Sequence, residues 1–305
     1  MHNTPKPWPA MGGLILAAML WSTSLVVLKI ALAKYHAYML VFGRMLVATL
    51  CFIPFFYRRR HAWKLQPGSL KYLLFMSLCE PCLYFLFEVE ALKQTTASQA
   101  GIITAILPLM VAMAASGFLR ERMTGRMMTG LVLAMIGVVW LSTGATKSMA
   151  APNPVLGNVL ELLAMVCATG YILSAKRLTS HFGYSPFLIT ASQALVGMLF
   201  YTPLLALPGI QWPHHWHAGF FLAIGYLGAF ITLGAYGLYN YGISRIPAGR
   251  AAAFINLIPV FTVFWAWLIL DERFSGQQCL AAVIILTGVF LSQIERRNAG
   301  RSAGG

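Results

Sequence analysis

Two stretches of this chain, residues 92–138 and 243–289, follow one pattern at a constant offset of 151 positions with no gap. The matched residues are Ala100 with Ala251, Pro108 with Pro259, Glu121-Arg122 with Glu272-Arg273, and Gly137 with Gly288. A similar offset extends the match upstream, where Tyr35 aligns with Tyr184 and Pro54 with Pro203. The chain is therefore one unit written twice, and it must fold as two similar halves.

Each half is too apolar for a water-soluble fold. Of 305 residues, 59% are hydrophobic and 10% are charged, which is too little polar surface to cover a soluble protein of this size. Apolar runs of about 20 residues, enough to cross a hydrocarbon core of about 30 Å, occur at about 11–33, 36–57, 70–92, 96–119, 124–145, 155–178, 185–206, 218–243, 247–270 and 276–295. We predict an all-α integral membrane protein of ten helices, with a first five-helix repeat over residues 11–145, a second over 155–295, and tails at 1–10 and 296–305.

The distribution of Lys and Arg predicts the orientation in the membrane. If the N-terminus is cytoplasmic, most positive residues fall in inner loops, including Arg58–Arg60 and the group Arg120, Arg122 and Arg126. Because positively charged loops stay cytoplasmic, we expect both termini in the cytoplasm, with the protein in a bacterial inner membrane. An odd number of helices per half then inverts the second half relative to the first, as in many secondary transporters.

Several other classes of protein lack sequence support. The net charge of +14 is scattered over short loops, which does not indicate nucleic-acid binding. The chain has no Walker motif, HExxH motif or nucleophile elbow, so neither an ATP-driven pump nor an enzyme is expected. We expect no cofactor and no metal, and we interpret His214, His215 and His217 as a solvated loop cluster. A channel is a further alternative, which would conduct without saturation.

Ionisable residues inside the apolar spans are the first candidates for function, since a charge at the membrane centre costs at least roughly 2.5–3.5 kcal/mol. These residues include Arg44 in the second span, Glu80 and Glu88 in the third, and Glu161 in the sixth. Glu80, Tyr84 and Glu88 follow at intervals of four and should share one helix face. We predict proton or cation coupling at Glu88, whose repeat mate is Tyr239, or at Glu80, with Arg44 either taking part or neutralising one carboxylate.

Aromatic and amide side chains are the second signal. The candidate substrate-binding residues are Trp21, Tyr84, Glu88, Tyr171, Tyr239, Asn240, Asn256 and Trp265. Several aromatic faces together with a carboxylate can hold an alkylammonium or aromatic ligand, although aromatic belts and ordinary packing use the same residues. Pro81, Pro108 and Pro259 lie within spans, where proline kinks a helix, and we predict them as hinges.

The order of these motifs resembles the EamA half-domain of the drug/metabolite transporter superfamily. The first half reads Leu20-Trp21-Ser22-Thr23-Ser24, then Lys29, Arg44, Ala100, Leu107-Pro108 and Glu121-Arg122, and the second half has Lys176, Ala251, Ile258-Pro259 and Asp271-Glu272-Arg273. The second half departs from the pattern with Ala168 in place of Trp21 and Gln193 in place of Arg44. The resemblance implies ten helices around a central cavity, lined mainly by helices one, three, four, six, eight and nine, and a carrier of small metabolites.

We therefore expect a secondary active transporter that moves an amino acid or an organic cation by alternating access, coupled to protons and in the direction of export. The alternative is exchange of nucleotide sugars or other phosphorylated metabolites, although a diphosphate would call for more Lys and Arg in the cavity than Arg44. The expected partners are the substrate and the lipid bilayer, without nucleic acid, and the expected state is a monomer or homodimer.

Overall fold

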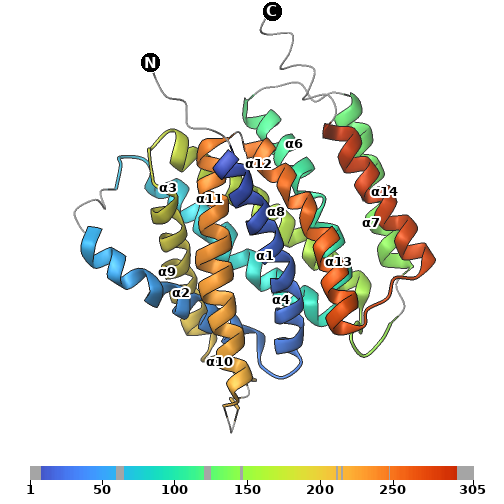
Figure 1. Ribbon diagram of the computed structural model, residues 1–305, viewed down its shortest axis with the longest axis horizontal. Coiled ribbons are helices and arrows are strands. Elements are labelled where there is room, and N and C mark those ends of the chain that lie inside the picture. The colour runs from blue at the N-terminus through green and yellow to red at the C-terminus, as the bar shows by residue number, and fades with distance from the viewer. Residues whose placement is uncertain are drawn as a thin grey trace, which may run out of the picture.

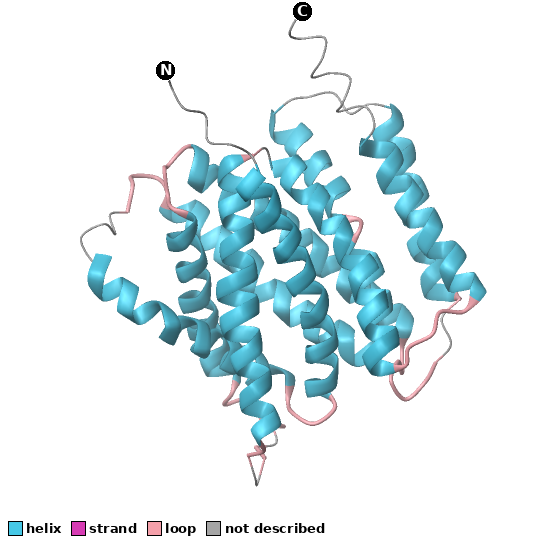
Figure 2. Ribbon diagram, in the orientation of Figure 1, coloured by secondary structure: helices cyan, strands magenta, loops and turns pink. Residues whose placement is uncertain are grey.

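The computed structural model describes residues 8–59, 65–119, 125–144, 147–210, 212–213, 216–246 and 248–293. Its elements are helices (Figure 1, Figure 2), and a single β-bridge joins Ser148 to Ala151. In chain order they are α1 (Trp8–Leu32), α2 (Ala37–Arg59), α3 (Leu70–Ser77), η2 (Leu78–Leu83), α4 (Tyr84–Gln94), α5 (Ala97–Thr104), α6 (Leu107–Leu119), α7 (Gly125–Thr143), α8 (Pro154–Ser180), α9 (Pro186–Leu204), α10 (Ala218–Gly225), η3 (Tyr226–Ala235), α11 (Tyr236–Arg245), α12 (Ala248–Ala253), η4 (Phe254–Asn256), α13 (Leu257–Leu270) and α14 (Gly276–Gln293). The predicted residues Glu121, Arg122, His214 and His215 and most of both tails lie outside the described residues.

The all-helical membrane fold predicted from the sequence is confirmed. Within the described ranges, eight helical stretches are long and apolar enough to cross a bilayer. They coincide with the first four predicted spans and with the sixth to the ninth. The predicted fifth and tenth spans coincide with two shorter apolar stretches, Met128–Thr143 and Gly276–Leu291. These two belong to α7 and α14, which pack along each other at one side of the molecule (Figure 1).

The two halves run in opposite directions. In Figure 1 the third span descends from α3 to α4, whereas its repeat mate ascends from α10 to α11. Both spans contain a π-helical segment at equivalent positions, η2 in the first half and η3 in the second. In η2, Pro81 lacks the N–H that a regular helix needs. In η3, the Thr232 hydroxyl donates to the carbonyl of Leu227, five residues earlier, at 3.0 Å. The third span is therefore interrupted at Pro81, as predicted.

The fourth and ninth spans are also broken at equivalent places. The fourth is interrupted between α5 and α6, two to three residues before Pro108, and the ninth passes through the 3₁₀ turn η4 before Pro259. A proline ring collides with the carbonyl four residues earlier, and those residues are Thr104, where α5 ends, and Ile255 in η4. The breaks thus have one cause in both halves. The role of these prolines as pivots stays a prediction.

A lysine caps the end of the third span, and its mate caps the end of the eighth. The Lys29 ammonium donates to the carbonyls of Leu92, Thr95 and Ala150, with distances of 2.6 Å to Thr95 and Ala150. Lys176 donates to the carbonyls of Ile243 at 2.8 Å and Ile246 at 3.1 Å. The last carbonyls of a helix have no partner within the helix and carry partial negative charge. Both lysines therefore stabilise helix ends that the lipid could not satisfy.

A carboxylate of the second half caps the N-terminus of a helix in the first half. Glu272 follows α13, and its two carboxylate oxygens accept from the backbone N–H groups of Ala97 at 3.0 Å and Ser98 at 2.9 Å. These are the first residues of α5, where unpaired N–H groups favour an anion. The second half thus caps a helix of the first half. The conspicuous lysines and this glutamate of the repeated motif serve the scaffold.

The contact between α7 and α14 allows a direct test of the packing. A Cβ atom on Gly288 would lie 2.6 Å from the carbonyl oxygen of Gly130 and 2.7 Å from the backbone nitrogen of Ala134. Backbone atoms cannot move aside as a flexible side chain can, so Gly288→Ala should destabilise the protein by about 1–3 kcal/mol. Thermal unfolding in detergent measures this, with Gly276→Ala as the control because that site has open space. Equal unfolding midpoints for both variants would contradict the packing.

Candidate functional site

A cavity of about 50 Å³ lies between the two halves. It is lined by α1, α2, η2, α4, α5 and α6 from the first half and by α8, α11, η4 and α13 from the second. The predicted residues that line it are Trp21, Arg44, Glu80, Tyr84, Glu88, Tyr171 and Tyr239. A space of this size holds a few water molecules, whereas pockets for small molecules measure roughly 300–1,000 Å³. A metabolite can therefore enter only if the surrounding helices move apart.

Glu80 connects the two halves across this cavity. It lies in η2 and is buried, at 3% exposed. Its carboxylate accepts a hydrogen bond from the hydroxyl of Tyr236, on α11 of the second half. Its backbone carbonyl is 3.4 Å from the side-chain amide of Gln193 on α9. Glu80 is thus held by two helices of the opposite half.

Glu88 has a different set of contacts, because its partner lies on its own helix. One carboxylate oxygen accepts from the Tyr84 hydroxyl at 2.8 Å, one turn earlier on α4. Glu88 is buried, and both residues line the cavity. The cavity therefore presents the carboxylates of Glu80 and Glu88 together with a phenol on one helical span.

Arg44 supplies positive charge to the same cavity. Its Nε atom donates to the Thr232 hydroxyl at 2.7 Å, and its guanidinium carbon lies 4.1 Å from the centroid of the Phe85 ring. In the part of the chain that the structure describes, no ion pair within 4.0 Å joins Arg44 to Glu80 or Glu88. The guanidinium is thus held by a hydroxyl and an aromatic face. A guanidinium and two carboxyl groups thus line one cavity without an ion pair between them.

Aromatic rings form much of the remaining wall. The Trp21 ring lies 5.0 Å from the rings of both Tyr236 and Tyr239, and Tyr171 lies 6.1 Å from Tyr236. The indole nitrogen of Trp21 and the hydroxyl of Tyr239 are buried and have no hydrogen-bond partner among the described residues. Buried polar groups are nearly always hydrogen-bonded. The cavity therefore offers two unused donors to an incoming acceptor.

Three predicted binding residues lie outside the cavity lining. Asn240 accepts from the Tyr171 hydroxyl at 2.8 Å and donates to Thr190 at 2.9 Å, so it positions Tyr171. Asn256 is in η4, and its side-chain oxygen has no partner among the described atoms. Trp265 packs against a separate apolar cluster of Val26, Ala97 and Ala266.

Sequence reasoning missed two residues that position Arg44. Thr232 accepts the Arg44 hydrogen bond, and Phe85 lies beneath the guanidinium. Phe85 occupies the position equivalent to Tyr236 under the repeat offset, and both line the cavity. This correspondence was the available signal for Phe85. No comparable signal pointed to Thr232, because the hydroxyl of a lone threonine in an apolar span usually forms a hydrogen bond within its own helix.

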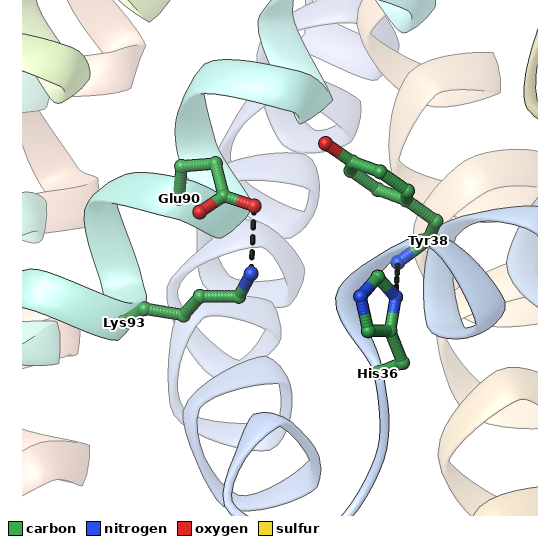
Figure 3. A network of polar contacts seen from close by, with 4 residues as sticks. All are labelled: His36, Tyr38, Glu90 and Lys93. Carbon is green, nitrogen blue, oxygen red and sulfur yellow. Dashed lines mark hydrogen bonds and ion pairs between the residues drawn. The ribbon is translucent and has the colours of Figure 1, made fainter. Parts of the chain in front are cut away.

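A second polar group lies where α1 connects to α2. Glu90 forms an ion pair of 2.7 Å with Lys93 near the end of α4, and His36 and Tyr38 face this pair from the start of α2 (Figure 3). The His36 ring accepts from the backbone N–H of Tyr38 at 3.3 Å. Partial burial lowers the pKa of His36, the nearby Lys93 lowers it further, and Glu90 opposes both. The net effect is a lowered pKa, which favours the neutral imidazole.

The inverted halves, the broken helices and a buried polar cavity at their interface are features typical of membrane transporters. The profile of the EamA-like transporter family matches residues 8–143 and again residues 155–293. The chain belongs to this family, as the repeated motifs implied.

Several relatives match about nine-tenths of the chain. An uncharacterized transporter of Archaeoglobus fulgidus is 25% identical over 280 residues, which is 92% of this chain and 95% of the relative. A protein of Escherichia coli named a probable amino-acid metabolite efflux pump is 26% identical over 284 residues, 91% of this chain and 92% of the relative. A crystal structure of 19% identity matches with a TM-score of 0.68 over 95% of this chain and 98% of that one. That likeness supports the fold.

Proposed function

We propose that this protein is a secondary active transporter that exports a small amino- or ammonium-bearing metabolite in exchange for protons. The observation that carries the proposal is the cavity between the inverted halves, which contains the carboxylates of Glu80 and Glu88, the guanidinium of Arg44 and several aromatic faces. Opposite charges held apart in one buried site match the two ends of an amino acid. Amino acids are therefore the favoured substrates, ahead of simple organic cations.

The two ends of an amino acid have separate partners in this cavity. Its ammonium group suits Glu88 and the faces of Trp21 and Tyr84. Its carboxylate suits Arg44, because a guanidinium group can donate two parallel hydrogen bonds to a carboxylate. The unused donors on Trp21 and Tyr239 suit the carboxylate as well. The name of the Escherichia coli relative supports this substrate class.

The contracted cavity and the broken spans support alternating access. The site is too small for a metabolite in this conformation, so the helices around it must rearrange for binding. The spans that carry Pro81, Pro108 and Pro259 are interrupted beside the cavity, and helices broken near a binding site are typical of such carriers. In our proposal, a proton and the substrate's ammonium group compete for Glu88, which couples their opposite movements.

Binding of candidate ligands to the purified protein tests the substrate class. Amino acids should raise the thermal unfolding midpoint, because a ligand at 100 times its Kd adds about 2.7 kcal/mol of stability. Arg44→Gln should lose the response to amino acids but keep a response to amines without a carboxylate. Lys34→Gln, at an exposed position, serves as the control. Stabilisation by nucleotide sugars and none by amino acids or amines would favour the phosphorylated-metabolite alternative.

The role of Glu88 is tested by Glu88→Gln, which keeps the size of the side chain and removes its charge. Accumulation driven by a pH gradient should be lost, while counterflow of substrate is partly retained. If Glu88 grips the substrate without carrying the proton, both activities should fall together. The control is Glu90→Gln, because Glu90 lies on the same helix but outside the cavity. Normal proton-driven transport by Glu88→Gln would shift the assignment to Glu80.

We also propose that both termini are cytoplasmic, in the inner membrane of a bacterium. Support comes from the positive inner loops and from the start of α1 and the end of α14, which lie on one side of the molecule (Figure 1). A cysteine in place of His61 should be labelled by a membrane-impermeant maleimide in inside-out vesicles only. Labelling of intact cells would reverse the orientation.

A further inference from the structure

The sixth span carries a buried carboxylate that the central cavity does not include. Glu161 lies on α8 with no exposed surface, and it is absent from the cavity lining. Both oxygens of its carboxylate are buried and have no hydrogen-bond partner among the described residues. An ionised carboxylate in such a place is very costly. The carboxyl group of Glu161 therefore holds a proton in this conformation.

Among the described residues, no positively charged side chain forms an ion pair with Glu161. The ion pairs among the described residues are Glu90–Lys93 and Asp271–Arg273, and neither involves Glu161. Of the helices packed against α8, α5 and α6 have no ionisable side chain. α4 also packs against α8, and it carries Tyr84 and Glu88 at the cavity and the ion pair of Glu90 with Lys93.

Asn158, a neighbouring polar residue on α8, has hydrogen-bond partners on three other elements. Asn158, one turn before Glu161, donates to Gln99 and to Ser142, each at 2.9 Å, and accepts from the Thr95 hydroxyl at 2.8 Å. These bonds tie α8 to the end of α4 and to α5 and α7. The hydrogen-bonding groups of Asn158 are thus used, whereas the Glu161 carboxyl group has no partner among the described residues.

We propose that Glu161 is a second proton-binding site of the transporter, which exchanges its proton with Glu88. This inference rests on the proposed proton coupling. Helix packing brings the two carboxyl groups to one interface, because Gly157, one turn before Glu161, lies against Ala91 and Thr95 at the end of α4, and Glu88 lies one turn before Ala91. In the exchange, the Glu161 carboxyl group gives its proton to an ionised Glu88 carboxylate. Glu161 is left ionised, and the number of protons is conserved.

A second site of this kind supplies the proton that replaces the substrate. After the substrate leaves, Glu161 gives its proton to Glu88 and takes another from the solution, so the pair then holds two protons. When an ammonium group binds, Glu88 must be ionised, and the pair, which titrates as a unit, holds one proton and one negative charge. One proton therefore moves opposite to each substrate. Glu161 lies outside the cavity lining, where the substrate does not compete for its proton.

Infrared spectroscopy of the protein in lipid tests the proton on Glu161 without any substrate. The carbonyl band of a protonated, non-hydrogen-bonded carboxyl group should be present at neutral pH, should disappear in Glu161→Gln and should remain in the control Glu90→Gln. In Glu88→Gln, the band should shift because its interacting neighbour has lost the ability to ionise. A band unaffected by Glu161→Gln would overturn the proposal, and this result does not depend on the substrate.

Transport in proteoliposomes tests the exchange, with a radiolabelled mixture of the standard amino acids as the probe. A gradient of one pH unit sustains about a tenfold substrate gradient per coupled proton. Glu161→Gln should lose this tenfold accumulation and keep counterflow, whereas Glu161→Asp, which can still bind a proton, should recover part of it. Normal accumulation by Glu161→Gln would overturn the exchange. If the wild type moves no amino acid, the proposed function fails, and the infrared band still decides whether Glu161 holds a proton.

Discussion

Lipid offers no hydrogen bonds to a backbone, and this constraint explains the conspicuous polar residues of the scaffold. The spans around the cavity are broken, and each break or end exposes backbone groups that need partners. Lys29 and Lys176 supply donors to the carbonyls where the third and eighth spans end. Glu272 supplies an acceptor to the first N–H groups of α5. Without these side chains, the ends of these helices would leave backbone groups without partners.

The features of the scaffold repeat in both halves, whereas those of the cavity do not. The lysine caps, the π-helical segments and the breaks before Pro108 and Pro259 occur in both halves. The chemistry of the cavity does not repeat. The second half has Gln193 in place of Arg44 and Ala168 in place of Trp21, so charge and aromatic surface come from unequal contributions. The duplication is therefore visible in the side chains that satisfy helix ends, while the two halves contribute different residues to the cavity.

Much of the fold and part of the site could be predicted because both depend on local periodicity. Apolar length located the spans, and four-residue spacing placed Tyr84 and Glu88 on one face, where their side chains meet. Periodicity does not determine how each helix is rotated toward its neighbours. This rotation packs Trp265 against a separate apolar cluster and places Phe85 beneath Arg44. The rotation depends on how each helix packs against its neighbours, and only the packed structure contains that information.

The bond between Glu80 and Tyr236 gives the molecule a latch at its centre. It joins η2 of one half to α11 of the other, so any movement that separates these helices must break it. The same movement widens the cavity and leaves the Glu80 carboxylate without its phenol. Opening the protein and exposing a carboxylate to a ligand are then a single event. A cation that takes the place of the phenol would hold the helices apart until it leaves.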